Sequence, residues 1–180
     1  MLLILDLDET LMHASQGLQG EPDFNMWDYQ VKVRPHLQRF LEVAFEHFDV
    51  AVWSSSSADY AALAVEHLFP EPAKLKFLWA RERCTYCWDA EVQDFVWAKR
   101  LYKVKRLGYG LERVLVIDDS PEKFRTAYGN LIRVSPFYGD PHDQELIRLA
   151  CYLEKITNVQ NVRKVEKRHW YSLVEPPPQI

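Results

Sequence analysis

The sequence predicts a single α/β domain built on an open parallel sheet with helices on both of its faces. Three short runs, residues 2–5, 49–53 and 113–117, are apolar apart from their first residues Asp49 and Arg113, the pattern of strands buried on both sides. Segments with the three- and four-residue spacing of amphipathic helices separate them. This alternation is typical of parallel sheets, which bind ligands beyond the carboxyl ends of their strands.

The composition is that of an ordinary globular domain. The chain has 180 residues, 48% of them hydrophobic and 27% charged, a size that one domain accommodates. The formal net charge of −4 argues against general binding to nucleic acids or to membranes. The first apolar run is too short for a signal peptide or a spanning helix, and the three cysteines form no disulfide framework, so we expect a cytoplasmic protein. Nothing in the sequence indicates an oligomeric state.

Two acidic residues follow the first apolar run. Asp6 and Asp8 would both project from the carboxyl end of a central strand. Carboxylates this close repel each other unless a cation or a proton lies between them. The pair therefore predicts a magnesium-assisted site in which one carboxylate stays ionised and the other can carry a proton. The alternative is a solvated turn or a helix cap.

The next segments predict a loop, a strand and two helices. Residues 16–25 are polar and glycine-rich, which favours a loop over the site, and residues 29–33 alternate like a strand. A helix opens at Pro35, and another is expected over residues 58–69. Between these helices, residues 54–57 are four serines at the end of the second buried strand. Hydroxyls there can bind a phosphate or simply cap the helix.

The middle of the chain carries two cysteines and several aromatic residues. Cys84 and Cys87 form a lone C-x-x-C, whereas zinc needs four ligands, so we expect reduced structural thiols, with zinc binding and redox chemistry as alternatives. Residues 88–97 read as two short strands about a polar turn. We expect the aromatic side chains to pack on this hairpin, and a peptide pocket is the alternative.

A second pair of acids repeats the pattern of the first. Asp118 and Asp119 follow the buried run 113–117, and Pro121 then opens a helix. One acid pair at the end of a strand could arise by chance, but two strands that each end in paired carboxylates favour a metal site. We expect a last strand at 131–134, a helix at 143–155 and a basic solvated face at 163–168. The domain would then span residues 1–168, with a proline-rich tail at 169–180 outside the fold.

The run Asp6-Leu7-Asp8-Glu9-Thr10 resembles the D-x-D-x-[TV] signature of the haloacid dehalogenase superfamily. Within it, the chain is most similar to the C-terminal-domain phosphatases and the nuclear-LIM-interactor-interacting-factor-like phosphatases. The resemblance covers roughly residues 1–165, and further matching segments follow in order at 33–41, 53–61, 81–84, 99–101 and 118–121. It implies the haloacid dehalogenase fold, a Rossmann-like parallel sheet, with a small β-hairpin inserted between the second and third motifs.

The resemblance also implies roles for single residues. Asp6 is the expected nucleophile and Asp8 the general acid and base, supported by Thr10. The expected phosphate ligands are Ser54, with Ser55 as its rival, Lys99, with Lys103 as its rival, and Arg81, which could instead be a surface arginine paired with Glu82. The family holds magnesium with groups that correspond to Asp6, Asp119 and the backbone carbonyl of Asp8, supported by Asp118.

The function implied by the resemblance is magnesium-dependent hydrolysis of phosphomonoesters through an aspartyl-phosphate. The expected partner is a protein or peptide carrying phosphoserine or phosphothreonine, because no large lid is predicted over the site. A small metabolite or a nucleic-acid 3′-phosphate is an alternative substrate. The rival from another class is a non-catalytic phosphopeptide-binding or scaffold domain, which would lack a nucleophile or a metal ligand.

Overall fold

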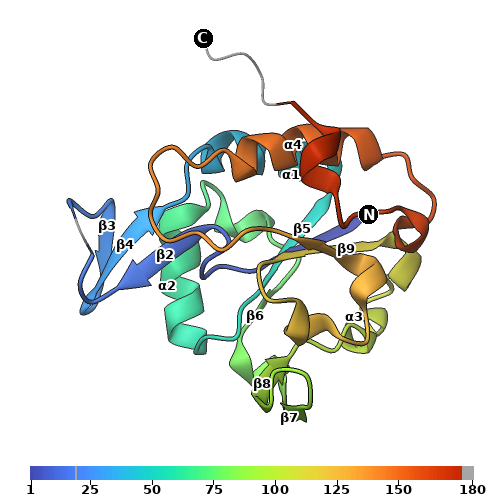
Figure 1. Ribbon diagram of the computed structural model, residues 1–180, viewed down its shortest axis with the longest axis horizontal. Coiled ribbons are helices and arrows are strands. Elements are labelled where there is room, and N and C mark those ends of the chain that lie inside the picture. Colours follow the sequence, from blue (N-terminus) through green and yellow to red (C-terminus); the bar gives the residue numbers. More distant parts are fainter. Residues whose placement is uncertain (19, 176–180) are drawn as a thin grey trace.

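The computed structural model describes residues 1–18 and 20–175. Its centre is a parallel sheet of five strands in the order β10-β9-β1-β5-β6. Figure 1 shows helices packed above and below this sheet. The strands are β1 (Leu2–Leu5), β5 (Asp49–Trp53), β6 (Leu78–Trp79), β9 (Val114–Asp118) and β10 (Leu131–Arg133). The predicted α/β architecture with a parallel sheet is confirmed.

The first strand lies in the middle of the sheet because every residue in it is apolar. All four residues of β1 are fully buried. Leu5 pairs with Val52 of β5 on one side and with Ile117 of β9 on the other. The three apolar runs therefore end at the same edge of the sheet, and the polar residues that follow them meet there.

The helices cover the two faces unequally. Leu3 and Leu5 face a core to which three helices contribute, α1 (Leu37–His47), α2 (Ala58–Leu68) and α4 (Glu145–Ile156). Leu2 and Ile4 face a smaller core covered by α3 (Tyr102–Lys105) and by a 3₁₀ helix, η4 (Pro121–Phe124). Helices on both faces were expected, but Pro121 opens this short 3₁₀ helix and not an α-helix. Among the described residues, no helix is both long and apolar enough to cross a lipid bilayer.

A small antiparallel sheet follows the first motif. Its strands are β2 (Met12–Ser15), β3 (Phe24–Met26) and β4 (Tyr29–Val33), in the order β2-β4-β3. The strand at 29–33 was predicted, but residues 16–25 were expected to be a loop throughout, and this was wrong for their last two positions. Phe24 pairs with Val31. The partner of this strand lies outside residues 16–25, so the polar composition of that segment alone does not indicate the pairing.

The predicted hairpin is present and is longer than expected. It consists of β7 (Thr85–Asp89) and β8 (Asp94–Ala98), which pair antiparallel along their whole length. Arg125 anchors its tip by contacts with Asp89 and Glu91. Tyr86 and Phe95 stack on the exposed side of the hairpin, with ring centroids 4.9 Å apart. The aromatic side chains therefore pack along the hairpin, as predicted.

Short 3₁₀ helices complete the chain. They are η1 (Pro72–Lys74), η2 (Arg81–Arg83), η3 (Leu111–Arg113), η5 (Tyr128–Asn130), η6 (Val162–Lys164) and η7 (Trp170–Leu173). The last of these corrects the predicted boundary of the tail, because Trp170 is 3% exposed and belongs to the main core. Its indole Nε1 donates a hydrogen bond of 2.7 Å to the carbonyl of Arg133. Residues 176–180, which include the prolines of the predicted tail, lie outside the described residues.

Candidate active site

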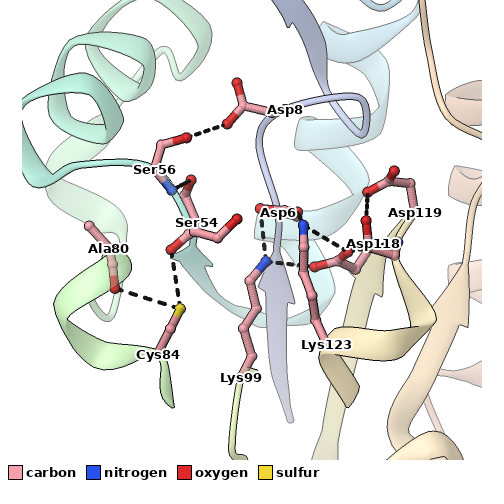
Figure 2. Close-up of polar contacts among 12 residues, drawn as sticks. Asp6, Asp8, Ser54, Ser56, Ala80, Cys84, Lys99, Asp118, Asp119 and Lys123 are labelled. Carbon is pink, nitrogen blue, oxygen red and sulfur yellow. Dashed lines mark hydrogen bonds and ion pairs between the residues drawn. The ribbon is translucent and has the colours of Figure 1, made fainter. Parts of the chain in front are cut away.

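Three carboxylates meet where β1 and β9 end. Asp6 follows β1, and its backbone N–H donates a hydrogen bond of 3.0 Å to the carbonyl of Ile117. This bond holds the first motif beside Asp118 and Asp119. One carboxylate oxygen from each of the three aspartates lies within 4.8 Å of the other two (Figure 2). Sequence analysis predicted this convergence from the two acid pairs.

Two lysines surround the Asp6 carboxylate. Nζ of Lys99 lies 2.9 Å from Oδ1 of Asp6, and Nζ of Lys123 lies 3.2 Å from Oδ2. Asp6 is 2% exposed and Lys99 is fully buried. Burial alone would raise the pKa of Asp6, but the two ammonium groups outweigh burial and hold this pKa well below its usual range. Asp6 is therefore an anion that needs no base to deprotonate it.

Asp118 lies deepest in the cluster. Its Oδ2 accepts a hydrogen bond of 2.6 Å from Lys99, and its Oδ1 lies 3.7 Å from Nζ of Lys123. Burial, together with the nearby charge of Asp6, raises the pKa of Asp118 to about 7 despite both lysines. Oδ1 of Asp118 also accepts a hydrogen bond from the backbone of Ser120, which fixes the turn that carries Asp119.

The donor set suits a hard divalent cation. Asp6, Asp118 and Asp119 bring three acidic side chains against two lysines. The surplus is negative, and carboxylate oxygens are the ligands that magnesium prefers. Asp119 is only half-buried, and its Oδ1 accepts a hydrogen bond from the Ser120 hydroxyl, so its other oxygen can turn to a cation. The residues present therefore fit a magnesium site.

Asp8 lies apart from the carboxylate cluster. Its Oδ2 accepts a hydrogen bond of 2.8 Å from the Ser56 hydroxyl and its Oδ1 one of 2.6 Å from the Tyr60 hydroxyl. Figure 2 shows Asp8 turned toward Ser56 and away from Asp6. Burial raises the pKa of Asp8, and the charge of Asp6 adds to the increase, while the hydrogen bonds from Tyr60 and Ser56 oppose it. The net effect leaves the pKa of Asp8 above its usual range, so Asp8 can carry a proton in this site.

The four serines occupy different environments. Ser54 is fully buried at the end of β5, and its Oγ accepts a hydrogen bond of 2.9 Å from the backbone N–H of Ser56. Ser55 is half-buried, and its carbonyl accepts a hydrogen bond of 2.7 Å from Nε of Arg81. Ser57 precedes α2 but makes no side-chain capping bond. Ser54 is thus the more deeply buried of the two candidate serines, and Figure 2 shows it beside Ser56.

The two candidate lysines of the third motif are also separated. Lys99 lies between Asp6 and Asp118, whereas Nζ of Lys103 donates to the carbonyl of Arg83 at 2.7 Å. Lys103 therefore serves the base of the hairpin. The guanidinium of Arg81 lies 5.5 Å from the ring centroid of Trp97, and no ion pair joins Arg81 to Glu82 in the described parts of the chain. Arg81 thus stands at the rim of the site and not inside it.

The sequence did not single out three polar side chains of the site. Lys123 follows the fourth motif in η4, and its position was hidden by the assumption that Pro121 opens an α-helix. Ser56 was one of four equivalent serines, and Tyr60 matched the family pattern without an assigned role. One signal could have placed Tyr60 near Asp8. Tyr60 follows Ser54 by six residues and lies in the first turn of α2, close to the edge of the sheet where the first motif ends.

A buried arginine binds the backbone of the first motif. Arg34 is fully buried and makes two hydrogen bonds to the Asp143 carboxylate, at 2.9 and 2.8 Å. It also donates a 3.1 Å bond to the carbonyl of Thr10. Thr10 is fully buried, and its hydroxyl has no hydrogen-bond partner within the described ranges 1–18 and 20–175. Thr10 therefore acts through its backbone and its packing.

The cysteines of the C-x-x-C are free thiols. The Cys84 thiol is buried and lies 3.8 Å from the carbonyl of Ser54. Burial raises its pKa, which keeps it protonated and unreactive. Cys87 lies 3.4 Å from the guanidinium of Arg100. Cys84 thus packs between the start of the hairpin and the end of β5, whereas Cys87 lies within the hairpin, opposite Val96.

Comparison with known proteins places the chain in a family. The family model of the NLI interacting factor-like phosphatases matches residues 1–163. The chain belongs to this family. The resemblance seen in the sequence is thereby confirmed over nearly the whole of the described structure.

Relatives from several organisms match most of the chain. It is 34% identical over 169 residues to CTD small phosphatase-like protein 2 of Dictyostelium discoideum, a match covering 89% of this chain and 28% of that protein. It is 27% identical over 183 residues to the CTD nuclear envelope phosphatase 1 homolog of Drosophila melanogaster, covering 93% of this chain and 72% of that protein. The chain thus spans little more than a quarter of the Dictyostelium protein.

A solved structure shares the fold. The structure of Fcp1, described as an essential RNA polymerase II CTD phosphatase, superposes with a TM-score of 0.58 at 16% sequence identity. The match covers 98% of this chain and 58% of that one. This similarity shows that the chain shares the fold of that phosphatase, a parallel sheet with helices on both faces.

Proposed function

We propose that this domain is a magnesium-dependent phosphatase that hydrolyses phosphomonoesters through an aspartyl-phosphate on Asp6. The observation that carries the proposal is the Asp6 carboxylate, held ionised between Lys99 and Lys123 at the edge of a carboxylate cluster. A carboxylate of this kind is a ready nucleophile toward phosphorus. Family membership supports the same chemistry.

In the first half of the reaction, an oxygen of Asp6 forms a bond to phosphorus while the bond from phosphorus to the leaving oxygen breaks. Asp8 gives its proton to that oxygen, which leaves as an alcohol. The raised pKa of Asp8 suits it for this task, because the carboxyl group must arrive protonated. Ser56 and Tyr60 hold the Asp8 side chain at two points and fix its direction.

In the second half, Asp8, now ionised, removes a proton from a water molecule that attacks the phosphorus of the aspartyl-phosphate. The bond between phosphorus and Asp6 breaks, and inorganic phosphate leaves. The hydrogen bonds from Ser56 and Tyr60 stabilise the ionised form of Asp8. Asp8 can therefore act as the acid in the first half and as the base in the second.

Fixed donors would hold the phosphoryl oxygens during transfer. We assign this task to Lys99, which is buried beside Asp6, and to Ser54 at the end of β5. Lys123 adds a second cation on the opposite oxygen of Asp6. Positive groups preset around the reacting centre offset the charge that develops on phosphoryl oxygens. Arg81 stands at the rim, where it can meet the phosphate after its guanidinium leaves Trp97.

The cation would be held by carboxylate oxygens of Asp6 and Asp119 and by the backbone carbonyl of Asp8. Asp118 supports the set through its hydrogen bonds to Lys99 and to the Ser120 backbone. When bound, magnesium screens the repulsion between the Asp6 carboxylate and the phosphate dianion. Lys99 and Lys123 act in the same sense, and together these cations let two anions approach each other.

We further propose that the substrate is phosphoserine or phosphothreonine in a protein. The insertion after the first motif is a small three-stranded sheet and the insertion after the second is a two-stranded hairpin, neither large enough to close over the site. An open site admits a side chain on a protein surface. The Dictyostelium and Drosophila relatives carry the names of CTD phosphatases, which supports this choice. Cytoplasmic location stays a prediction, since the Drosophila relative is named for the nuclear envelope.

The test is hydrolysis of para-nitrophenyl phosphate by wild type and Asp6→Asn, with magnesium and with a chelator. Turnover should require magnesium and should vanish in Asp6→Asn, which keeps the shape of the nucleophile without its charge. A panel of phosphoserine peptides, phosphorylated metabolites and 3′-phosphorylated oligonucleotides then ranks the substrate classes. Absence of turnover by folded wild type at every magnesium concentration would refute the catalytic proposal and favour a phosphopeptide-binding domain.

A further inference from the structure

A second concave surface lies beside the active site, on the outer side of the edge strand β10. It has a volume of about 580 Å³. Four basic residues line it, Arg133 from β10 and Arg163, Lys167 and Arg168 from the segment around η6. We call this surface the basic groove. It stands out in a chain whose formal net charge is −4.

Most of the positive charge in the basic groove is not neutralised. Glu166 is the one acidic residue among the described residues that line it, and it pairs with Arg168 at 2.6 Å. Arg133 and Arg163 are exposed, and within the described structure neither guanidinium has a carboxylate at ion-pair distance. Two free guanidinium groups in a concave surface can each donate paired hydrogen bonds to an anion, which is how arginine recognises carboxylates and phosphates.

Lys167 has a structural part in the groove. Its ammonium group is buried and donates hydrogen bonds to the carbonyls of Val162 and Val165. These bonds tie η6 to the turn that follows it and so fix the positions of Arg163 and Arg168. Arg163 also packs against Gly129, where a Cβ would lie at an ordinary contact distance of 3.4 Å from Cβ of Arg163. The groove is therefore held in shape from two sides.

The groove adjoins the catalytic cluster directly. Pro121, which lines it, follows Asp119 by two residues. Arg133 pairs in register with Asp118 across the sheet, and neighbouring strands lie about 4.8 Å apart. Leu131 and Arg133 share a face of β10, the face on which η4 packs. A peptide whose phosphorylated side chain reaches Asp6 can thus lay its neighbouring residues in the groove.

We propose that the basic groove binds acidic or phosphorylated residues that flank the target phosphoserine or phosphothreonine in the protein substrate. This inference rests on the proposed function and adds a preference for acidic sequence context. A protein segment fits better than a nucleic acid, because the groove is short and the rest of the molecule is acidic. Polyanions that extend beyond the groove would meet that negative charge.

The experiment compares matched phosphoserine peptides. One carries aspartates on the N-terminal side, a second carries them on the C-terminal side, and a third has asparagines in their place. We expect wild type to show about a tenfold higher kcat/KM for one acidic peptide than for the asparagine peptide, because two charge-assisted pairs are gained. Arg133→Ala/Arg163→Ala should reduce that ratio to about one and leave turnover of para-nitrophenyl phosphate unchanged. The control Arg39→Ala/Lys74→Ala removes the same charge elsewhere and should keep the ratio.

Equal kcat/KM for the three peptides in wild type would overturn the inference, as would a double variant that lowers all three alike. Direct binding separates this failure from failure of the proposed function. In Asp6→Asn, an aspartate-rich peptide without phosphoserine should bind more tightly than its asparagine version, and Arg133→Ala/Arg163→Ala should remove the difference whether or not the enzyme turns over. The same binding measurement with a single-stranded oligonucleotide gives the remaining outcome. If Arg133→Ala/Arg163→Ala weakens binding of the oligonucleotide but not of the acidic peptide, the groove binds nucleic acid and the proposal is refuted.

Discussion

Nζ of Lys123 lies 3.2 Å from Oδ2 of Asp6, on the side of the carboxylate opposite Lys99. The two cations together keep Asp6 ionised although it is buried. Negative neighbours raise the pKa of Lys123 well above its usual range, so its charge persists over the whole working range of pH. Lys123 is therefore a permanent part of the electrostatics of the nucleophile.

Replacing Lys123 should cost activity because it removes one of the two charges beside the nucleophile. We expect Lys123→Met to lower kcat about 10² to 10³-fold, the range found for the loss of one preset donor at a reacting centre. Lys123→Arg keeps the charge and should retain more activity than Lys123→Met. Steady-state kinetics with para-nitrophenyl phosphate measure both. A Lys123→Met variant within threefold of wild type would mean that Lys99 alone suffices.

Magnesium should stabilise the folded protein through Asp119. Ligand that binds only the folded state raises its stability by about 2.7 kcal/mol at a hundred times the dissociation constant. Wild type should therefore unfold at a higher temperature when magnesium is added. Asp119→Ala should lose most of this increase, and Asp28→Asn, which changes an exposed acid, should keep it. Thermal scans with and without magnesium check this without any need for turnover, and an undiminished shift in Asp119→Ala would remove it from the ligand set.

The hydroxyl of Tyr60 should set the pH at which Asp8 loses its proton. Its hydrogen bond stabilises the ionised form, so it lowers the pKa of Asp8. Without it the pKa rises further. As a general acid, Asp8 must be protonated, and kcat/KM falls as pH increases through its pKa. In Tyr60→Phe this fall should begin at a higher pH, by about half a unit to one unit for a single hydrogen bond.

The pH profile of kcat/KM for wild type, Tyr60→Phe and the control Tyr102→Phe measures this shift. Tyr102 is an exposed tyrosine of α3 and should give the wild-type profile. A displacement of the alkaline limb to lower pH in Tyr60→Phe would contradict the assignment of Asp8 as the acid.

Arg34 should be far more important for stability than other arginines. It is fully buried and satisfies both Asp143 and the Thr10 carbonyl. Arg34→Met leaves the Asp143 carboxylate without its partner, and we expect a loss of about 3 to 5 kcal/mol in the free energy of unfolding. Arg39→Met on the exposed side of α1 should change it by less than about 1 kcal/mol. Urea denaturation compares the two, and similar losses would show that the buried pair contributes nothing special.

The sequence predicted the parts of the fold and site that depend on short contiguous patterns. Strands β1, β5 and β9 are built on short apolar runs, and the residues that follow each run meet at one edge of a parallel sheet. This is why the meeting of Asp6, Asp118 and Asp119 could be foreseen. The hairpin at 85–98 was also visible, because two alternating segments flank a turn.

Features that depend on distant partners were not visible. Phe24 belongs to a strand only because Val31 pairs with it, and Trp170 is buried only because α4 and β10 lie beneath it. Lys123 contacts Asp6 although the two residues are 117 positions apart in the sequence. It lies in the 3₁₀ helix η4, and Pro121 alone does not specify which way the side chains of that helix point. Lysine in a polar stretch normally indicates solvent exposure, and only the tertiary structure shows that this one faces the nucleophile.

The hydrogen bond from the Trp170 indole to the carbonyl of Arg133 shows that the folded domain extends at least to residue 170. β10 is an outer strand, and such a strand offers its free backbone groups to any other chain that can add to the sheet. The segment around η7 occupies part of that border and so covers backbone groups of β10 that could pair with another chain. A chain cut at residue 163, where the family match ends, would expose this border, and it should assemble edge to edge while its catalytic residues stay intact.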